Sequence, residues 1–467
     1  MKTKLSFVLC LIFIAAAAVS AQWSQDRKLS TTDSATQLNE NMGTCLVACG
    51  DTLHAVWCDT KNNGSAIYYK RSIDTGVTWG PDTRLSATPG HAEFPAIACA
   101  GSTLHLVFRD SRGAQNASYY KRSQDGGATW EPDVFLDTAY WWPSVAASGP
   151  LVYVVLNDTI ITNGVSNSEV YFRRSLDNGN SWGALQRISN AAGRSEDPAI
   201  ATDGAHVYLA WNDNRTGVMQ TWFRISTDSG VTWGPERQLT SSTVFAYSPM
   251  IHVYGHDVYI PWEDRRNNNN FDIYLIHSSD FGATWGTEER LSQDAGASAY
   301  PDLARDGQNI HMVWFNIPGG LCYLHSGDAG ATWDQAVNLV DSASQPMQPF
   351  IAVTGPVVHV IWTDMRDGHR AIYYKRNPTG NVAATAVSLL NRAAQTSGSR
   401  FTAAFGRGVL SVNFPSNNKT AFALYDSFGR NVRAFTGNRT TDDFSPGTYI
   451  LRADGLHAGP IRIVKVK

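Results

Sequence analysis

The chain has 467 residues, with 38 basic against 41 acidic side chains and a formal charge of -3. This balance argues against nucleic acid as a partner, because phosphate binding needs a cationic surplus on one face. Hydrophobic residues make up 43% and charged residues 17% of the sequence, which excludes a chain that is disordered throughout. The length predicts at least two domains.

The first residues predict a secretory signal peptide over residues 1–21. Two lysines precede an apolar run over residues 5–18 that is too short to span a bilayer, and Val19-Ser20-Ala21 supplies a small-residue cleavage site. We expect an exported chain that starts near Gln22, passes through the periplasm and is secreted or attached to the outer surface, with no transmembrane segment. The five cysteines that remain are expected mainly as small buried side chains.

An octad that begins with Ser, has Asp at its third position and ends with Trp recurs six times. The first copy is Ser72-Ile-Asp-Thr-Gly-Val-Thr-Trp79, and its aspartate recurs every 48–52 residues. Such a period indicates a β-propeller or array. Asp can accept backbone N–H bonds across a tight turn and Trp can pack against neighbouring elements, so we interpret the octads as structural hairpin clamps. Their aspartates are Asp74, Asp125, Asp177, Asp228, Asp280 and Asp328.

The residues around each octad predict a unit of four strands, with the octad between the third and the fourth. The first two strands, such as residues 94–99 and 104–108, are almost continuously apolar, whereas the last two alternate between apolar and polar residues. This difference is expected of the inner and outer strands of a propeller blade.

The number of units predicts how the ring closes. The chain contains seven copies of the second strand but only six intact octads, and residues 23–30 have the spacing of residues 79–86. We therefore expect the N-terminal segment to supply the fourth strand of the last unit, which removes exposed sheet edges. The predicted fold is all-β, with a seven-bladed propeller over residues 22–378 and six blades as the alternative.

The octads are Asp boxes, and with them residues 22–378 resemble the bacterial neuraminidase repeat and sialidase-like propellers. The resemblance implies a propeller, six-bladed in the sialidases themselves, and an exo-α-sialidase-type glycoside hydrolase as one possible activity. Family sialidases also carry an arginine in a Phe/Tyr-Arg-Ile-Pro motif before the first box. This chain lacks that motif, because Phe223-Arg-Ile-Ser226 lies in the register of a third strand. The sequence therefore leaves open whether the protein is an enzyme.

A different composition begins after the repeats. Residues 379–400 are rich in Ala, Ser and Thr and are predicted to be a linker. Short apolar runs between turn residues then predict a small β-sandwich over residues 401–467. Residues 424–430, 445–452 and 461–467 together resemble the sorting domain of type IX secretion substrates, which implies a partner in the export machinery. A generic accessory sandwich is the alternative.

The face of the propeller opposite the Asp boxes is the predicted binding face. Its turns between second and third strands repeat an Asp-x-Arg pair, which either holds a ligand or pairs within the blade. The connections that lead into the first strands add aromatic rings beside acids, a combination that suits a saccharide. The candidate ligand-binding residues are Glu93, Arg112, Tyr140, Trp141, Trp142, Glu196, Asp197, Arg215, Tyr247, Arg266, Tyr300 and Arg366.

We therefore expect an exported or cell-surface propeller that recognises a glycan or glycoconjugate. The alternatives are the sialidase-type hydrolase and a purely structural surface protein. For hydrolysis, Tyr247 or Tyr300 beside Glu196 or Glu263 could be the nucleophile pair, with Asp197 as the acid. No catalytic residue is assigned. No cofactor or metal site is predicted, because the cysteines lack clustered histidines.

Overall fold

The computed structural model describes residues 23–380, with gaps at 32–35, 39–42, 62–63, 87–90, 113–115, 139–140, 163–164, 268–269, 294–295, 318–319 and 341–343, together with the strands after residue 401. The predicted signal peptide, nearly all of the predicted linker and Tyr140 lie outside the described residues. The chain forms two compact units, Met1–Val382 and Ala383–Lys467. Every regular element among the described residues is a strand, so that none is a helix able to cross a membrane.

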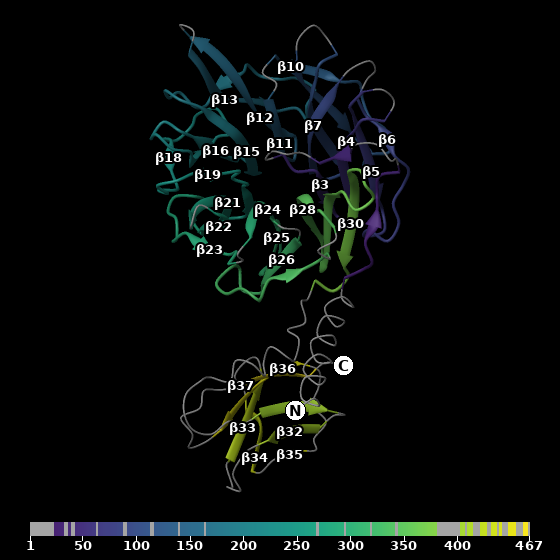
Figure 1. The fold of residues 1–467 in the computed structure, drawn as a ribbon, viewed down its shortest axis with the longest axis vertical. Helices are drawn as coiled ribbons and strands as arrows, with labels where there is room; N and C mark the ends of the chain where they lie inside the picture. Colours follow the sequence, from purple (N-terminus) through teal and green to yellow (C-terminus); the bar gives the residue numbers. More distant parts are fainter. Residues whose placement is uncertain are drawn as a thin grey trace. The chain divides into compact units, whose positions relative to one another are not determined.

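The larger unit is a seven-bladed propeller whose blades are antiparallel sheets (Figure 1). The first four blades comprise β2 (Thr36–Gln37), β3 (Leu46–Cys49), β4 (Thr52–Asp59), β5 (Ala66–Ser72) and β6 (Thr83–Arg84); β7 (Ala92–Ala100), β8 (Thr103–Asp110), β9 (Ala117–Ser123) and β10 (Val134–Asp137); β11 (Trp141–Ser148), β12 (Leu151–Thr162), β13 (Val165–Ser175) and β14 (Gln186–Arg187); and β15 (Ser195–Asp203), β16 (His206–Asp213), β17 (Gln220–Ser226) and β18 (Arg237–Gln238).

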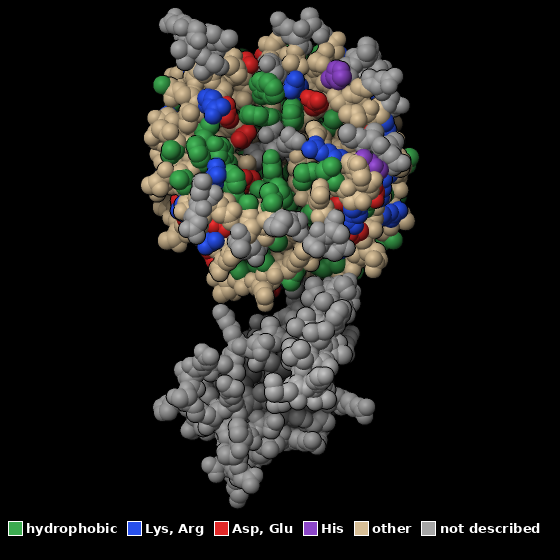
Figure 2. Space-filling model, viewed as in Figure 1, with side chains coloured by type: hydrophobic (Ala, Val, Ile, Leu, Met, Phe, Trp, Pro, Cys, Tyr) green, Lys and Arg blue, Asp and Glu red, His purple; other side chains and the backbone are tan. Residues whose placement is uncertain are grey.

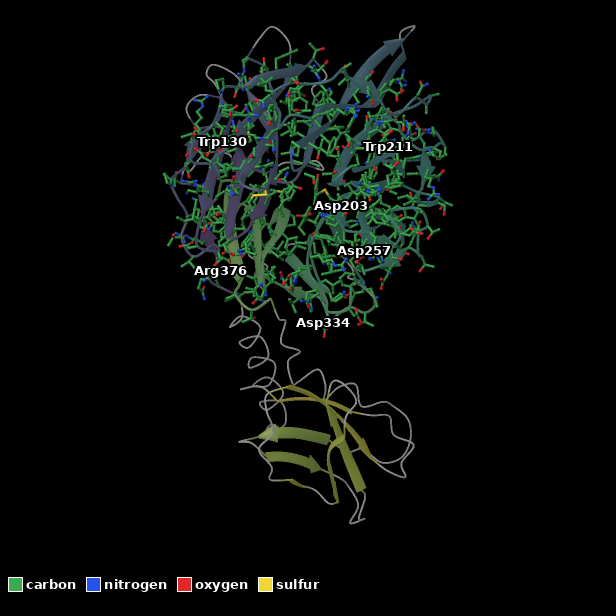
Figure 3. All side chains as sticks on the ribbon, turned by 180° about the vertical axis from the view of Figure 1, so that it is seen from behind. Trp130, Asp203, Trp211, Asp257, Asp334 and Arg376 are labelled. Atoms are coloured by element: carbon green, nitrogen blue, oxygen red, sulfur yellow. A yellow bond between two sulfur atoms is a disulfide. The ribbon has the colours of Figure 1, made fainter. Side chains whose placement is uncertain are left out.

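The last three blades comprise β19 (Ala246–Tyr247), β20 (His252–Tyr254), β21 (Asp257–Asn267), β22 (Asn270–Ser278) and β23 (Glu289–Arg290); β24 (Ala297–Asp306), β25 (Asn309–Ile317), β26 (Gly320–Ser326) and β27 (Val337–Asn338); and β28 (Met347–Thr354), β29 (Val357–Asp364), β30 (Ala371–Asn377) and β1 (Arg27–Lys28). In each blade the first strand lies innermost. Seen from behind, Asp203 at the end of an innermost strand lies near the centre, whereas Trp130, Asp334 and Arg376 lie toward the edge (Figure 3).

The predicted closure of the ring and the count of seven blades are confirmed. Strand β1 pairs with β30 so that Arg27 lies opposite Tyr374, and the Leu29 amide donates to the Ile372 carbonyl at 2.7 Å. Trp23 is 6% exposed and packs edge-to-face on Tyr323 of the preceding blade, with ring centroids 5.0 Å apart. The N-terminal segment is therefore both the outer strand of the last blade and part of its contact with the neighbouring blade.

The Asp boxes close the hairpins between third and fourth strands and tie neighbouring blades together. Asp228 accepts hydrogen bonds from the Ser226 hydroxyl at 2.8 Å, and from the amide and hydroxyl of Thr232 at 2.8 and 2.6 Å. Gly230 has φ +75°, and a Cβ there would lie 2.5 Å from the ring of Phe172 in the preceding blade. Trp233 packs edge-to-face on the same ring, with centroids 5.0 Å apart. This box thus needs glycine where the aromatic ring of the preceding blade approaches.

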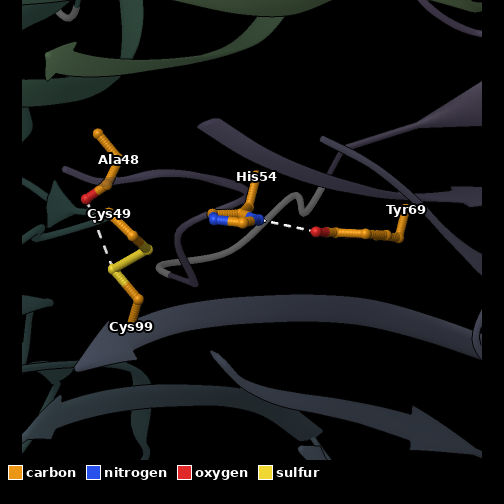
Figure 4. The surroundings of a disulfide bond; sticks show 5 residues. All are labelled: Ala48, Cys49, His54, Tyr69 and Cys99. Carbon is orange, nitrogen blue, oxygen red and sulfur yellow. Dashed lines mark hydrogen bonds between the residues drawn. A yellow bond between two sulfur atoms is a disulfide. The ribbon is translucent and has the colours of Figure 1, made fainter. Parts of the chain in front are cut away.

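One disulfide links the innermost strands of the first two blades. Cys49 of β3 bonds to Cys99 of β7, which lies 50 residues further along the chain (Figure 4). Close by, the Tyr69 hydroxyl and His54 Nδ1 share a hydrogen bond of 2.7 Å. The expectation that the cysteines are small buried side chains is met by Cys45, Cys58 and Cys322, which are buried, and is wrong for the bonded pair Cys49 and Cys99.

The smaller unit contains two antiparallel sheets. One has the order β31-β32-β35 and the other the order β34-β33-β36-β37. That these sheets form a sandwich with a sorting role stays a prediction. The strands are β31 (Thr402–Gly406), β32 (Val409–Asn413), β33 (Ala421–Asp426), β34 (Asn431–Thr436), β35 (Arg439–Thr440), β36 (Gly447–Ala453) and β37 (Ile461–Lys465).

Candidate functional site

Six blades place a non-glycine residue with left-handed backbone directly before a proline of the innermost strand. The φ angles lie between 49° and 55°, and in five of the blades the strand ladder shifts register at this point. Positive φ is costly for residues with a Cβ, and such strain gathers at functional sites. All six lie at the end of the strand opposite the Asp-box turns. This pre-proline ring consists of Phe94, Trp142, Asp197, Ser248, Tyr300 and Gln348.

Five residues of the pre-proline ring contact the second strand of their own blade. In each blade the partner residue on the second strand comes directly after a buried aromatic residue of that strand. The partner holds the side chain of the pre-proline residue in place. That side chain therefore has little conformational entropy left to lose when a ligand binds. The contacts are Arg109 over the Phe94 ring at 5.7 Å, Asn212 to Asp197 at 2.7 Å, Ser248 hydrogen-bonded to Glu263, Tyr300 stacked on Phe315 at 5.6 Å, and Thr363 to Gln348 at 3.2 Å.

Two acidic side chains from neighbouring blades have raised pKa values: Asp197 of the ring and Glu263, the second-strand partner of Ser248. Burial raises the pKa of Asp197 to about 7, and the adjacent Glu196 adds to the shift. Burial also raises the pKa of Glu263 to about 7, and the charge of Asp197 adds to that shift. Glu263 is 6% exposed and accepts the Tyr300 backbone N–H at 2.8 Å, whereas Asp197 stays partly exposed. The pair therefore holds protons near neutral pH, and one of the two acids is reachable from solvent.

Further polar and aromatic groups surround the carboxylates. Arg194 lies 3.5 Å from Glu196, which also accepts the Ser168 hydroxyl at 3.1 Å. Tyr247 lies opposite Glu263 in the ladder and stacks on Phe245, with centroids 5.4 Å apart. Burial raises the pKa of Tyr247, so its hydroxyl stays protonated at neutral pH. The predicted residues Glu196, Asp197, Tyr247 and Tyr300 are thus brought together around Glu263.

A second, aromatic sector of the same face lies on the second and third blades. The rings of Trp141 and Trp142 are 5.8 Å apart, and the Arg109 guanidinium lies 4.6 Å from the centroid of Trp141. Arg109 also lies 3.7 Å from Glu93. Figure 2 shows a face of the propeller on which hydrophobic side chains gather around the centre, with acidic and basic side chains between them.

The four predicted Asp-x-Arg arginines have partners on the outer half of their blades. Arg215 lies 2.5 Å from Asp213, pairs with Glu236 before the fourth strand, and lies 4.1 Å from the centroid of the Trp222 ring on the third strand. The same arrangement holds the other three. They are Arg112 with Asp110, Asp133 and Tyr119; Arg266 with Asp264, Glu288 and Tyr274; and Arg366 with Asp364, Asp26 and Tyr373.

Sequence reasoning missed Asn212, Ser248 and Phe315 and did not recognise the ring to which they belong. The signal that could have found it is the proline that recurs in the first strand of six units, because the residue before it changes from unit to unit. Among the described residues, no group of three or more His, Cys, Asp and Glu side chains is placed to hold a metal ion.

The sequence matches the family described as BNR repeat-like domain over residues 12–312. No relative was found among curated proteins. Solved structures with a similar fold include an ulvan lyase of a polysaccharide lyase family, with 11% identity and a TM-score of 0.50 over 74% of this chain and 95% of that one. A second is the endosialidase of phage phi92, with 10% identity and a TM-score of 0.48 over 95% of this chain and 87% of that one. A third is the sialidase of Trypanosoma rangeli, with 12% identity and a TM-score of 0.42 over 76% of this chain and 59% of that one. At these identities the likeness concerns the fold alone.

Proposed function

Since the chain belongs to the BNR repeat-like domain family and folds as a sialidase-like propeller, we propose that it recognises a glycan at the pre-proline ring. The observation that carries this proposal is the composition of the ring, which combines three aromatic with three hydrogen-bonding side chains around one mouth of the propeller. The C–H faces of a sugar stack on aromatic rings, while its hydroxyls need fixed polar partners.

Four of the six ring residues form one aromatic and one polar sector. Phe94 and Trp142 come from the second and third blades, whereas Asp197 and Ser248 come from the fourth and fifth. A pyranose lying across the mouth could therefore stack on one side and hydrogen-bond on the other. Because the polar groups are already held by second-strand partners, such binding would need little rearrangement.

Export is part of the same proposal. The signal-like residues 1–21 and the sorting-like residues 401–467 predict secretion or attachment to the outer surface. The disulfide between Cys49 and Cys99 supports this destination, because such bonds persist mainly in oxidising compartments. Export machinery would then be a partner of the C-terminal unit.

A sialidase-type activity has less support. The carboxylate of a sialic acid needs a cluster of arginines, whereas the acids Asp197 and Glu263 lie at this ring. Arg109 lies in the aromatic sector and contacts Glu93. A purely structural role leaves the strained ring unexplained.

A glycan-array screen of the purified chain, followed by calorimetry on the strongest hit, tests the proposal. Phe94→Ala should weaken binding about tenfold or more, because a stacking ring is lost. Phe135→Ala is the matched control, since this ring lies in the outer strand of the same blade and is 55% exposed. Absence of any glycan binding, or equal losses in both variants, would show that the ring does not recognise sugars.

A further inference from the structure

A second group of aromatic rings lies on the fifth blade, apart from the aromatic sector of the second and third blades. Phe245 stacks on Tyr247 with ring centroids 5.4 Å apart, and the ring of Phe271 lies 6.4 Å from that of Tyr247. The Arg265 guanidinium lies 4.8 Å from the centroid of Phe271. Phe245 is 38% exposed and the other two rings are partly exposed, so solvent reaches all three. These three rings form the Tyr247 platform.

The Tyr247 platform lies at the same mouth of the propeller as the pre-proline ring. Tyr247 directly precedes Ser248 of that ring and pairs with Glu263 near the end of the second strand. Phe271 lies at the start of β22, after the turn between the second and third strands. The Asp box of this blade begins at Ser278, at the other end of β22.

The aromatic sector forms a second set of rings at this mouth, the Trp141 platform, which consists of Phe94, Trp141 and Trp142. All three rings are partly exposed. The Arg109 guanidinium lies 4.6 Å from the centroid of Trp141 and 5.7 Å from that of Phe94, so it contacts rings of two blades. Both platforms can therefore offer ring surface to a ligand in the mouth.

The fourth blade lies between the two platforms and offers polar groups instead of rings. Residues 189–198, which lead into and begin its first strand, include no aromatic residue. The Arg194 side chain is 58% exposed and lies 3.5 Å from that of Glu196, which is 19% exposed. Asp197 follows directly and is partly exposed. Charged and amide groups of this kind form strong hydrogen bonds with sugar hydroxyls.

The spacing of the blades exceeds the length of one sugar ring. Strand β11 of the third blade contacts β15 of the fourth, and β15 contacts β20 of the fifth, so these blades are consecutive. Sheets that pack face to face lie about 10 Å apart, so the third and fifth blades are separated by roughly 15–20 Å. A single pyranose therefore cannot contact both platforms, whereas a chain of several pyranoses can.

We infer that the mouth binds several consecutive sugars of a linear glycan chain. Sugars of the chain stack on both platforms, and the sugars between them form hydrogen bonds with the fourth blade. This inference rests on the glycan recognition proposed above and adds the kind of glycan, a linear chain rather than a single terminal sugar. Once one platform is occupied, the second contact forms within the same complex, so affinity rises with chain length until both are reached.

Calorimetry of the purified full-length chain on oligosaccharides of increasing length tests this inference. Disaccharides and hexasaccharides are compared in four linear series, the cello-, manno-, chito- and galacturono-oligosaccharides. We expect the hexasaccharide of at least one series to bind about tenfold or more tightly than its disaccharide, because only the longer chain reaches both platforms. The series differ in substituents and charge, so the comparison also identifies which linear chain is bound.

Variants at each platform show whether both are used. Trp142→Ala and Tyr247→Ala should each lower the affinity for the hexasaccharide about tenfold and remove most of the gain with length. Phe135→Ala, on the outer strand of the second blade, is the matched control and should leave both affinities unchanged. Thermal melting identifies any variant that does not fold, and Trp141→Ala and Phe245→Ala then repeat the test at the same platforms.

The outcomes separate this inference from the proposal on which it rests. If glycans bind but hexasaccharides bind no more tightly than disaccharides, or if the array shows only branched or single terminal sugars, the linear chain is overturned and recognition stands. A gain with length that survives the loss of a ring from either platform also overturns the inference. Absence of binding to any glycan overturns both proposals.

Discussion

The residue before each inner proline combines an unfavourable backbone with a side chain at one mouth of the propeller, which is partly exposed in five of the six blades. Proline already restricts the preceding residue, and positive φ adds strain for any side chain with a Cβ. Glycine would relieve this strain, yet the ring holds aromatic, acidic, hydroxyl and amide side chains instead. On the proposal of glycan recognition, this strain is tolerated for the sake of the side chains that contact the ligand.

Asp197 should make the stability of the protein depend on pH. Its pKa is about 7 in the fold and near 4 in an unfolded chain. A raised carboxyl pKa stabilises the fold fully below about pH 4, and this contribution is lost as the pH rises through 7. The side chain of the variant Asp197→Asn cannot ionise, so the variant does not lose this stabilisation as the pH rises. Between pH 4 and 7 its free energy of unfolding should therefore exceed that of the parent by about 1–3 kcal/mol.

Urea unfolding at several pH values from 4 to 8 measures this difference. Asp203→Asn, in the same strand but exposed, should follow the parent at every pH. Parallel curves for the parent and Asp197→Asn would show that this carboxyl is not held in its protonated form by the fold.

At the scale of elements, the short outer strands contribute more than their length suggests. Strand β1 has two paired residues, but Trp23 before it is buried against Tyr323. Trp23→Ala should lower the free energy of unfolding by about 3–5 kcal/mol through the cavity it leaves. Deleting residues 22–31 should in addition expose the edge of β30 and cause aggregation.

Thermal unfolding and size-exclusion chromatography read out both changes. Phe135→Ala is again the control, because that aromatic ring is mostly exposed on an outer strand. If the deletion variant stays monomeric with an unchanged melting temperature, the last blade does not depend on the N-terminal strand.

The strands and their closure could be predicted because the Asp box repeats at a nearly constant interval and marks the same turn in each blade. The matching spacing of residues 23–30 even revealed the displaced fourth strand. The partners of the Asp-x-Arg arginines could not be predicted in this way. Arg215 is held by Glu236, which lies 21 residues away before a two-residue strand, and only the folded sheet brings them together. The Asp197–Glu263 pair likewise joins two blades.

At the scale of the whole molecule, the two compact units should be separable. Ending the chain after about residue 400 removes the strands β31 to β37 and leaves all seven blades intact. In a host with type IX secretion, the shortened protein should accumulate folded in the periplasm, because the sorting-like unit is missing. Cell fractionation with detection of the propeller measures this. Undiminished delivery to the surface or medium would assign the C-terminal unit another role.

The way the ring closes also sets the order of events during synthesis. Ser30 and Ile372, which are hydrogen-bonded in the last blade, lie 342 residues apart. The N-terminal strand of the propeller therefore has no strand to pair with until nearly the whole propeller has been made. Contacts of such long sequence separation form slowly. On the export route proposed above, this delay keeps the nascent chain from locking into a finished ring, so that it can still be threaded through a membrane pore before its two ends meet.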